Sequence, residues 1–172
     1  MRRTLTILAV MAAMCLSAAA QNNTDRIGAG IGASYRYAGN AVLFWEHEYA
    51  YHNAWEVFAE GQLQLQGLSE VSGLWDNGKR WGAGAAWKPC LRRARNRYGS
   101  ARVGVSLGAS PLDFQAGIQA GWQQSYALRG GWQFYWQAGA DLMLPKWDGL
   151  FRIGGSVGIK MPVRDRLHRR LN

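Results

Sequence analysis

The stretch RIGAGIGASYRY, from Arg26 to Tyr37, alternates large apolar side chains with small or polar ones. The odd-numbered positions hold Ile27, Ile31 and the alanines that follow each of them by two residues. The even-numbered positions hold Gly28 and further small or polar residues. Successive side chains of an extended strand point to opposite faces. The stretch is therefore predicted to be a strand with one apolar face and one small, polar face.

The same two-residue period recurs along the rest of the chain. It is found in residues 41–50, 55–66, 80–88, 101–109, 114–125, 132–144 and 151–161. An even number of strands, each near ten residues, is typical of a transmembrane barrel. We therefore predict an all-β fold, an eight-stranded antiparallel up-and-down membrane β-barrel with a polar, glycine-rich interior.

Side-chain volume indicates which face of the predicted strands is outside. The interior of an eight-stranded barrel is barely wide enough for its own side chains. The apolar faces carry seven of the nine tryptophans: Trp45, Trp55, Trp81, Trp87, Trp122, Trp132 and Trp136. These rings would overfill the interior, so we predict that they face lipid, with several at the headgroup level. A soluble, lipocalin-like ligand-binding barrel has the same alternation and is the alternative.

The N-terminal residues have the order of a signal peptide. Met-Arg-Arg at 1–3 precedes an apolar run at 5–16 and the small residues Ser-Ala-Ala-Ala at 17–20. This order predicts cleavage after Ala20 and export to the outer membrane. A lipoprotein signal at Cys15 is the less favoured alternative, because the bulky Met14 precedes that cysteine. The expected organisation is a signal peptide at 1–20, a short segment at 21–25, the barrel at 26–162 and a basic tail at 163–172.

The inward faces of the predicted strands carry acids and bases in near balance. They are Arg36, Glu46, Glu48, Glu56, Glu60, Arg80, Lys88, Arg102, Asp141, Arg152 and Lys160. Buried charges are tolerated only when they are paired. The alternating direction of the strands predicts that the four glutamates meet Arg102 and the two lysines at one level along the barrel axis. Asp141 is expected to meet one of the other three arginines near the opposite end, so that the network fills the lumen and leaves no open pore.

The residues that could carry chemistry are few and scattered. Cys90 is the one cysteine outside the signal peptide, which excludes an intramolecular disulfide and a Cys/His zinc site. His47, His52 and His168 fall on an outward face, in a turn and in the tail. Residues 28–33 fit a dinucleotide fingerprint formally, but no helix is expected after them. We therefore predict no catalytic site, cofactor or metal.

Two arginine clusters account for most of the excess positive charge. The formal charge of +9 falls to +7 without Arg2 and Arg3. The clusters are Arg92, Arg93, Arg95 and Arg97 in the connection after the fourth strand, and Arg164, Arg166, Arg169 and Arg170 in the tail. With the N-terminus in the periplasm, both would project to that side. A solvated charge run is the simplest explanation, an acidic protein or envelope polymer the next, and nucleic acid the least favoured, because no aromatic residues are interleaved for base stacking.

Three stretches carry a family resemblance: RWGAGAAWKPCLRRARNRYG (80–99), SYALRGGWQFYWQAGADL (125–142) and LFRIGGSVGIKMPV (150–163). They resemble small conjugal transfer proteins of the TraO type, encoded on bacterial conjugative transposons. The resemblance covers most of the chain after the signal peptide. It implies an outer-membrane component of a mating apparatus that binds other transfer proteins on its periplasmic side. A structural or adhesive envelope barrel unrelated to conjugation is the other membrane alternative.

Overall fold

The computed structural model of the chain describes residues 24–35, 37–63, 79–109, 114–144 and 151–163. The expected signal peptide, Arg36 and the four arginines of the tail lie outside these ranges. Within them, no helix is long and apolar enough to cross a membrane.

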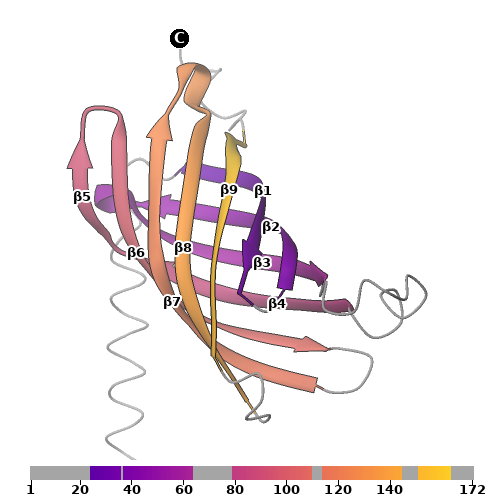
Figure 1. Ribbon diagram of the computed structural model, residues 1–172. Coiled ribbons are helices and arrows are strands. Elements are labelled where there is room, and N and C mark those ends of the chain that lie inside the picture. Colours follow the sequence, from indigo (N-terminus) through magenta and orange to yellow (C-terminus); the bar gives the residue numbers. More distant parts are fainter. Residues whose placement is uncertain (1–23, 36, 64–78, 110–113, 145–150, 164–172) are drawn as a thin grey trace, which may run out of the picture.

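The described ranges form nine strands and two short 3-10 turns (Figure 1). The strands are β1 (Thr24–Ser34), β2 (Tyr37–Tyr49), β3 (Asn53–Leu63), β4 (Lys79–Lys88), β5 (Cys90–Ala94), β6 (Arg97–Ala109), β7 (Phe114–Ala127), β8 (Gln133–Leu144) and β9 (Phe151–Pro162). The turns are η1 (Ala50–His52) and η2 (Arg129–Gly131). Each predicted segment corresponds to a strand, with ends that differ by a few residues.

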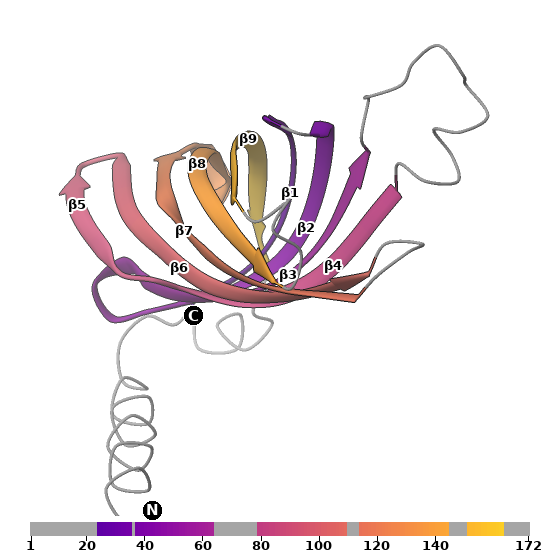
Figure 2. The same ribbon diagram turned by 60° about the horizontal axis from the view of Figure 1, so that its bottom comes forward.

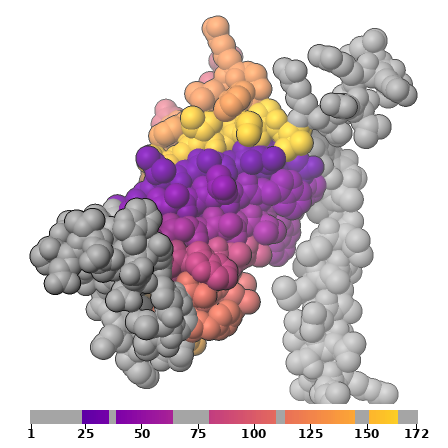
Figure 3. All heavy atoms as spheres, turned by 90° about the vertical axis from the view of Figure 1, so that its right-hand side faces the viewer, coloured from indigo at the N-terminus to yellow at the C-terminus, as the bar shows by residue number. Residues whose placement is uncertain are grey.

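The strands close into one antiparallel sheet. Each strand is paired with the next along the chain except β4, which is paired with β6 and not with β5, and β1 is paired with β9. Figure 3 shows one wall of this sheet, with β9 in yellow beside β1 in indigo and β2 next to it. β4 and β5 form a single stave that is interrupted at Pro89, which has no N–H group to donate. The fold is therefore an eight-stranded antiparallel β-barrel, as the alternation predicts.

The apolar faces of the strands are outside. Ile31 is 70% exposed and Trp81 is 67% exposed, whereas Tyr135 on an inward face is completely buried. Six of the seven strand tryptophans are exposed on the outer wall, and Trp122 is half-buried. The outward apolar side chains form a belt around the barrel, which we call the apolar belt; it includes Val103, Val105, Leu107 and Ile118.

Aromatic rings fill part of the lumen, in addition to the predicted small and charged residues. Phe44, Phe58 and Tyr135 are buried inside, and the rings of Phe44 and Tyr135 meet edge to face with centroids 5.4 Å apart. Inward glycines provide the space: a Cβ at Gly28 would overlap the Phe44 ring, and one at Gly84 would overlap the Phe58 ring. The glycine-rich face is therefore what allows a narrow barrel to hold large rings.

The two ends of the barrel differ in their connections. At the end that we call the short-turn end, strands are joined by η1, by a turn at residues 95–96 and by η2, and β1 begins and β9 ends there. Tyr51 and His52 in η1 adopt positive φ angles of 63° and 62°, and Gly130 of η2 has a φ of 74°. At the opposite end β1, β3, β6 and β8 end, and β2, β4, β7 and β9 begin.

Candidate functional site

A cluster of charges occupies the lumen in the half nearer the short-turn end. The Lys88 ammonium contacts Glu46 and lies 2.6 Å from a carboxylate oxygen of Glu56. Lys160 lies 2.7 Å from Glu46, and an Arg102 nitrogen lies 2.9 Å from Glu56. The predicted pairing of these two glutamates with both lysines and Arg102 is thus present in the structure.

A neutral amide completes this cluster. The side-chain oxygen of Gln123 accepts hydrogen bonds from both Lys88 and Lys160, each at 3.1 Å. In addition, Arg102 donates to Gln119 at 2.7 Å. Neither glutamine was among the predicted network residues. Their spacing of four residues on one strand was the available signal, because it puts both amides on the same face.

Glu48 departs from the predicted arrangement. It pairs with Arg26 across the β1–β2 ladder, and its carboxylate lies 2.6 Å from His52 Nδ1, near the rim of the short-turn end. Arg26 was not among the predicted network residues, although it lies in period with the inward glycines that follow it. The His52 ring also contacts Tyr98, with centroids 4.0 Å apart.

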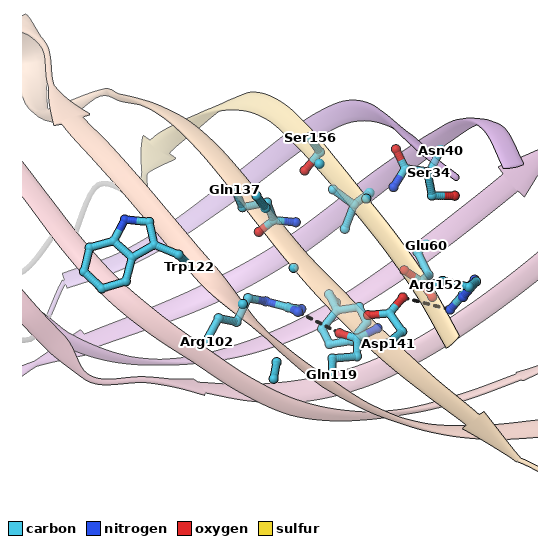
Figure 4. A pocket seen from close by; sticks show the side chains of 18 of the residues that line it. Ser34, Asn40, Glu60, Arg102, Gln119, Trp122, Gln137, Asp141, Arg152 and Ser156 are labelled. Atoms are coloured by element: carbon cyan, nitrogen blue, oxygen red, sulfur yellow. Dashed lines mark hydrogen bonds and ion pairs between the residues drawn. The ribbon is translucent and has the colours of Figure 1, made fainter. Parts of the chain in front are cut away.

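The remaining lumen charges lie in the other half of the barrel. Arg152 is paired with Asp141 at 2.9 Å and also contacts Gln62. Arg152, one of the three predicted partners of Asp141, is thus paired with it; Arg36 lies outside the described residues, and Arg80 lies in the same half, 3.5 Å from the Met143 sulfur. The prediction that all four glutamates share one level is wrong for Glu60. Its side chain lies near Arg152 and Asp141 (Figure 4), because it is four residues further along β3 than Glu56.

Two small cavities lie in the lumen between described residues. One of about 70 Å³ is lined by Glu60, Arg102 and Arg152 among others, and one of about 20 Å³ lies beside Lys88 and Lys160. Cavities of this size accept a few water molecules and are too small for a sugar chain or a peptide. The lumen charges are consequently internal partners of one another, which is a structural role.

No metal centre is formed in the part of the chain that the structure describes, where no three His, Cys, Asp or Glu side chains are grouped so that they could hold an ion. His47 lies on the outer wall and contacts Asp25 at 2.7 Å, while His52 contacts Glu48. Cys90 is buried with a free thiol. Residues 28–33 lie inside β1, without a helix after them.

The arginines of the first cluster lie on a β-hairpin. Arg92 and Arg93 belong to β5, Arg95 lies in the turn, and Arg97 begins β6. The connection in which these arginines were predicted is itself a paired hairpin, because the ladder continues past Pro89, with Arg93 opposite Tyr98 and the residue after it opposite Arg97. We call residues 90–100 the basic hairpin; it stands at the edge of the barrel in Figure 2.

The basic hairpin differs from the other connections of the short-turn end in having an open strand edge. β5 is hydrogen-bonded to β6 on one side, and among the described strands nothing pairs with its other side. Only its base is fixed there, where the Cys90 N–H donates to the Asn53 side chain at 2.8 Å. All four arginines are exposed, and Arg93 lies over the Tyr51 ring at 5.1 Å.

No protein-family model and no curated protein matches the sequence. The barrel is similar to the crystal structure of Neisserial surface protein A, with a TM-score of 0.53 and 13% identity over 81% of this chain and 96% of that chain. The fold is that of a small outer-membrane barrel. A de novo designed transmembrane β-barrel aligns with a TM-score of 0.49 and 11% identity, over 83% of this chain and 98% of that one.

Proposed function

We propose that this protein is an outer-membrane barrel that acts as a partner-binding component of a conjugative transfer apparatus, and that it works by binding and not by catalysis. The membrane location is supported by the apolar belt. Its side chains, such as Ile31, Val105 and Ile153, are more than half exposed, and a protein in water would leave this entire wall unfavourably hydrated.

The orientation follows from the connections. Barrels of bacterial outer membranes have short periplasmic turns and longer extracellular loops. The short-turn end, with the basic hairpin, would accordingly face the periplasm. A partner there is a periplasmic protein or a periplasmic part of another envelope protein.

The observation that carries the proposal is an exposed, arginine-rich hairpin with an open edge. Four guanidinium groups and no carboxylate lie within residues 90–100. An open strand edge can accept an extended segment from another chain through main-chain hydrogen bonds. The arginines would favour a segment that carries acidic side chains, because opposite charges attract, and they would reject a basic segment, because like charges repel. The resemblance to TraO-type proteins suggests that this segment belongs to another transfer protein.

The test is a transfer assay with the full chain in donor cells. Changing Arg92, Arg93, Arg95 and Arg97 together to glutamate is expected to lower DNA transfer by at least about tenfold, since several charge-assisted contacts of 1.5–3 kcal/mol each would become repulsive. The matched control changes the same four residues to lysine, which keeps the charge. The control should retain most of the transfer.

Folding is checked separately by heat-modifiable gel mobility of both variants in outer-membrane fractions. Folded protein with an unchanged transfer frequency in the glutamate variant would refute the docking role. An equal loss in the lysine and glutamate variants would show that charge is not what the partner recognises.

A further inference from the structure

The outer wall at the short-turn end contains a recess next to the basic hairpin. It has a volume of about 290 Å³ and is lined by Arg92, Ala94, Arg97, Gln124, Tyr126 and Trp136. These residues come from β5, β6, β7 and β8, four adjacent staves of the barrel. The recess is outside the lumen, because Gln124, Tyr126 and Trp136 alternate with the inward residues Gln123, Ser125 and Tyr135.

The strand register brings the residues that line the recess together. Arg92 is opposite Gly99, Gly99 is opposite Gln124, and Gln124 is opposite Trp136, so the four lie in one row across the sheet. At the middle of this row the Trp122 ring packs over Gly99, so closely that a Cβ there would overlap it. The recess is bordered by the two arginines on one side and by the Trp136 indole ring on the other.

Two guanidinium groups face this hollow. Arg97 is opposite both Ala94 and Tyr126, which places it one row from Arg92 and diagonally across the ladder on the same face. A bulge in β5, where Leu91 and Arg92 together oppose Gly99, turns Arg92 outward. Neither arginine forms an ion pair with any residue of the described ranges. Two such groups side by side favour an anion with several acceptor oxygens, and phosphate fits arginine forks well.

The position of the recess relative to the apolar belt indicates the source of that phosphate. Moving along β6 from Arg97, the next outward side chains beyond Ala101 are the exposed Val103 and Val105 of the belt. Tyr126 contacts the Phe134 ring, with centroids 6.2 Å apart, and Trp136 lies beside them. Tyrosine, tryptophan and arginine together mark the headgroup level of a membrane, where lipid tails lie on one side and water on the other.

We propose that Arg92 and Arg97 bind the phosphate of a glycerophospholipid of the periplasmic leaflet, with Gln124 and Trp136 against the glycerol region and the acyl chains along the apolar belt. This site goes beyond the partner docking proposed above. It uses the outward face of the basic hairpin, whereas Arg93 faces Tyr51 and Arg95 is in the turn. The lipid would hold the hairpin at a fixed height above the membrane.

The test is native mass spectrometry of the purified, folded full-length mature chain, released from detergent after titration with phosphatidylglycerol. The variant Arg92→Gln/Arg97→Gln removes both proposed phosphate ligands. The matched control, Arg93→Gln/Arg95→Gln, removes the same charge from the same hairpin. We expect one tightly bound lipid on the wild type and the control, and at least about tenfold weaker binding by the variant. Heat-modifiable mobility verifies that all three are folded.

A further arm separates a lipid site from a site for free phosphate compounds. Soluble glycerol 3-phosphate has the headgroup chemistry without the acyl chains, and it is expected not to displace the lipid at equal concentration. Displacement at equal concentration would overturn the lipid assignment. Equal binding by the wild type and the Arg92→Gln/Arg97→Gln variant would overturn the site, and so would equal losses in the variant and the control. None of these results depends on DNA transfer, so the proposed function and this site can fail independently.

Discussion

The lumen and the basic hairpin are both rich in charged side chains, but these are buried and paired in the lumen and exposed on the hairpin. In the lumen, Glu46, Lys88 and Lys160 are each at most 2% exposed and are in direct contact with opposite charges. On the basic hairpin, all four arginines are exposed. Buried ions require partners, because the energy of losing water is otherwise uncompensated. Exposed ions have no such requirement.

This difference separates structural charge from charge that is available for binding. The paired lumen ions, such as Glu46, Lys88 and Lys160, are held by residues from other strands, so their substitution should affect the stability of the whole barrel. Each hairpin arginine can be changed with little effect on folding, and an effect on function would then be a direct one. Each prediction compares a substitution in the barrel with a substitution in the basic hairpin. The quantity compared is the change in the free energy of unfolding, measured in urea with the protein in lipid vesicles.

The largest difference in stability loss between the lumen and the basic hairpin is expected when the charge of Glu46 is removed. Glu46→Gln leaves the two ammonium groups of Lys88 and Lys160 buried with one carboxylate fewer, and breaking a buried pair in this way costs about 3–5 kcal/mol. Arg95→Gln removes one charge from the basic hairpin and should change stability by less than about 0.5 kcal/mol. The double change Glu46→Gln/Lys160→Met should recover part of the loss, since it removes the ammonium that lost its partner. Similar losses for Glu46→Gln and Arg95→Gln would contradict the distinction.

A smaller difference in stability loss is expected between adding an arginine to the apolar belt and adding one to the basic hairpin. Val105 is 60% exposed in the apolar belt, and an arginine at the middle of a lipid-facing wall costs about 2–4 kcal/mol. Ala94→Arg adds the same charge to the exposed basic hairpin and should cost less than about 0.5 kcal/mol. In a soluble barrel both positions would face water, and both substitutions would be nearly neutral. A neutral Val105→Arg in vesicles would therefore speak against a membrane location as well.

The fold was largely predictable because side-chain alternation is a local property. Ile31 and Trp81 fall on the outer wall, and Glu56 and Lys88 fall inside, from the period of two alone. What the period does not determine is the level of each residue along the barrel axis. Glu60 lies in the half opposite to the predicted one for that reason, since its level depends on strand tilt and on the register with the neighbouring strands.

The basic hairpin was harder to predict for a different reason. A proline and a run of arginines read as a loop, because proline interrupts a ladder and charged residues have low strand propensity. In the structure β6 continues unbroken through Tyr98, and it supplies the template on which β5 resumes at Cys90. The recess beside it is lined by residues from four strands, which lie together only through the register of those strands. Such a hollow can be seen only once the register is known.

The smallest of the three differences in stability loss is expected between adding side-chain volume to the lumen and adding it to the basic hairpin. Gly84 lies against the Phe58 ring and the Val105 carbonyl, both of which a Cβ at this position would overlap. Gly84→Val is therefore expected to cost about 1–3 kcal/mol, the usual range for overpacking a filled interior. Ala94→Val adds a comparable volume on the exposed hairpin and should stay within about 0.5 kcal/mol of the wild type. Replacing Phe58 with leucine in the Gly84→Val background frees space where the valine needs it, so this double variant should be more stable than Gly84→Val alone. If it is not, the ring is not what requires glycine at this position, and the narrow lumen does not explain why the inward face of the barrel is so rich in glycine.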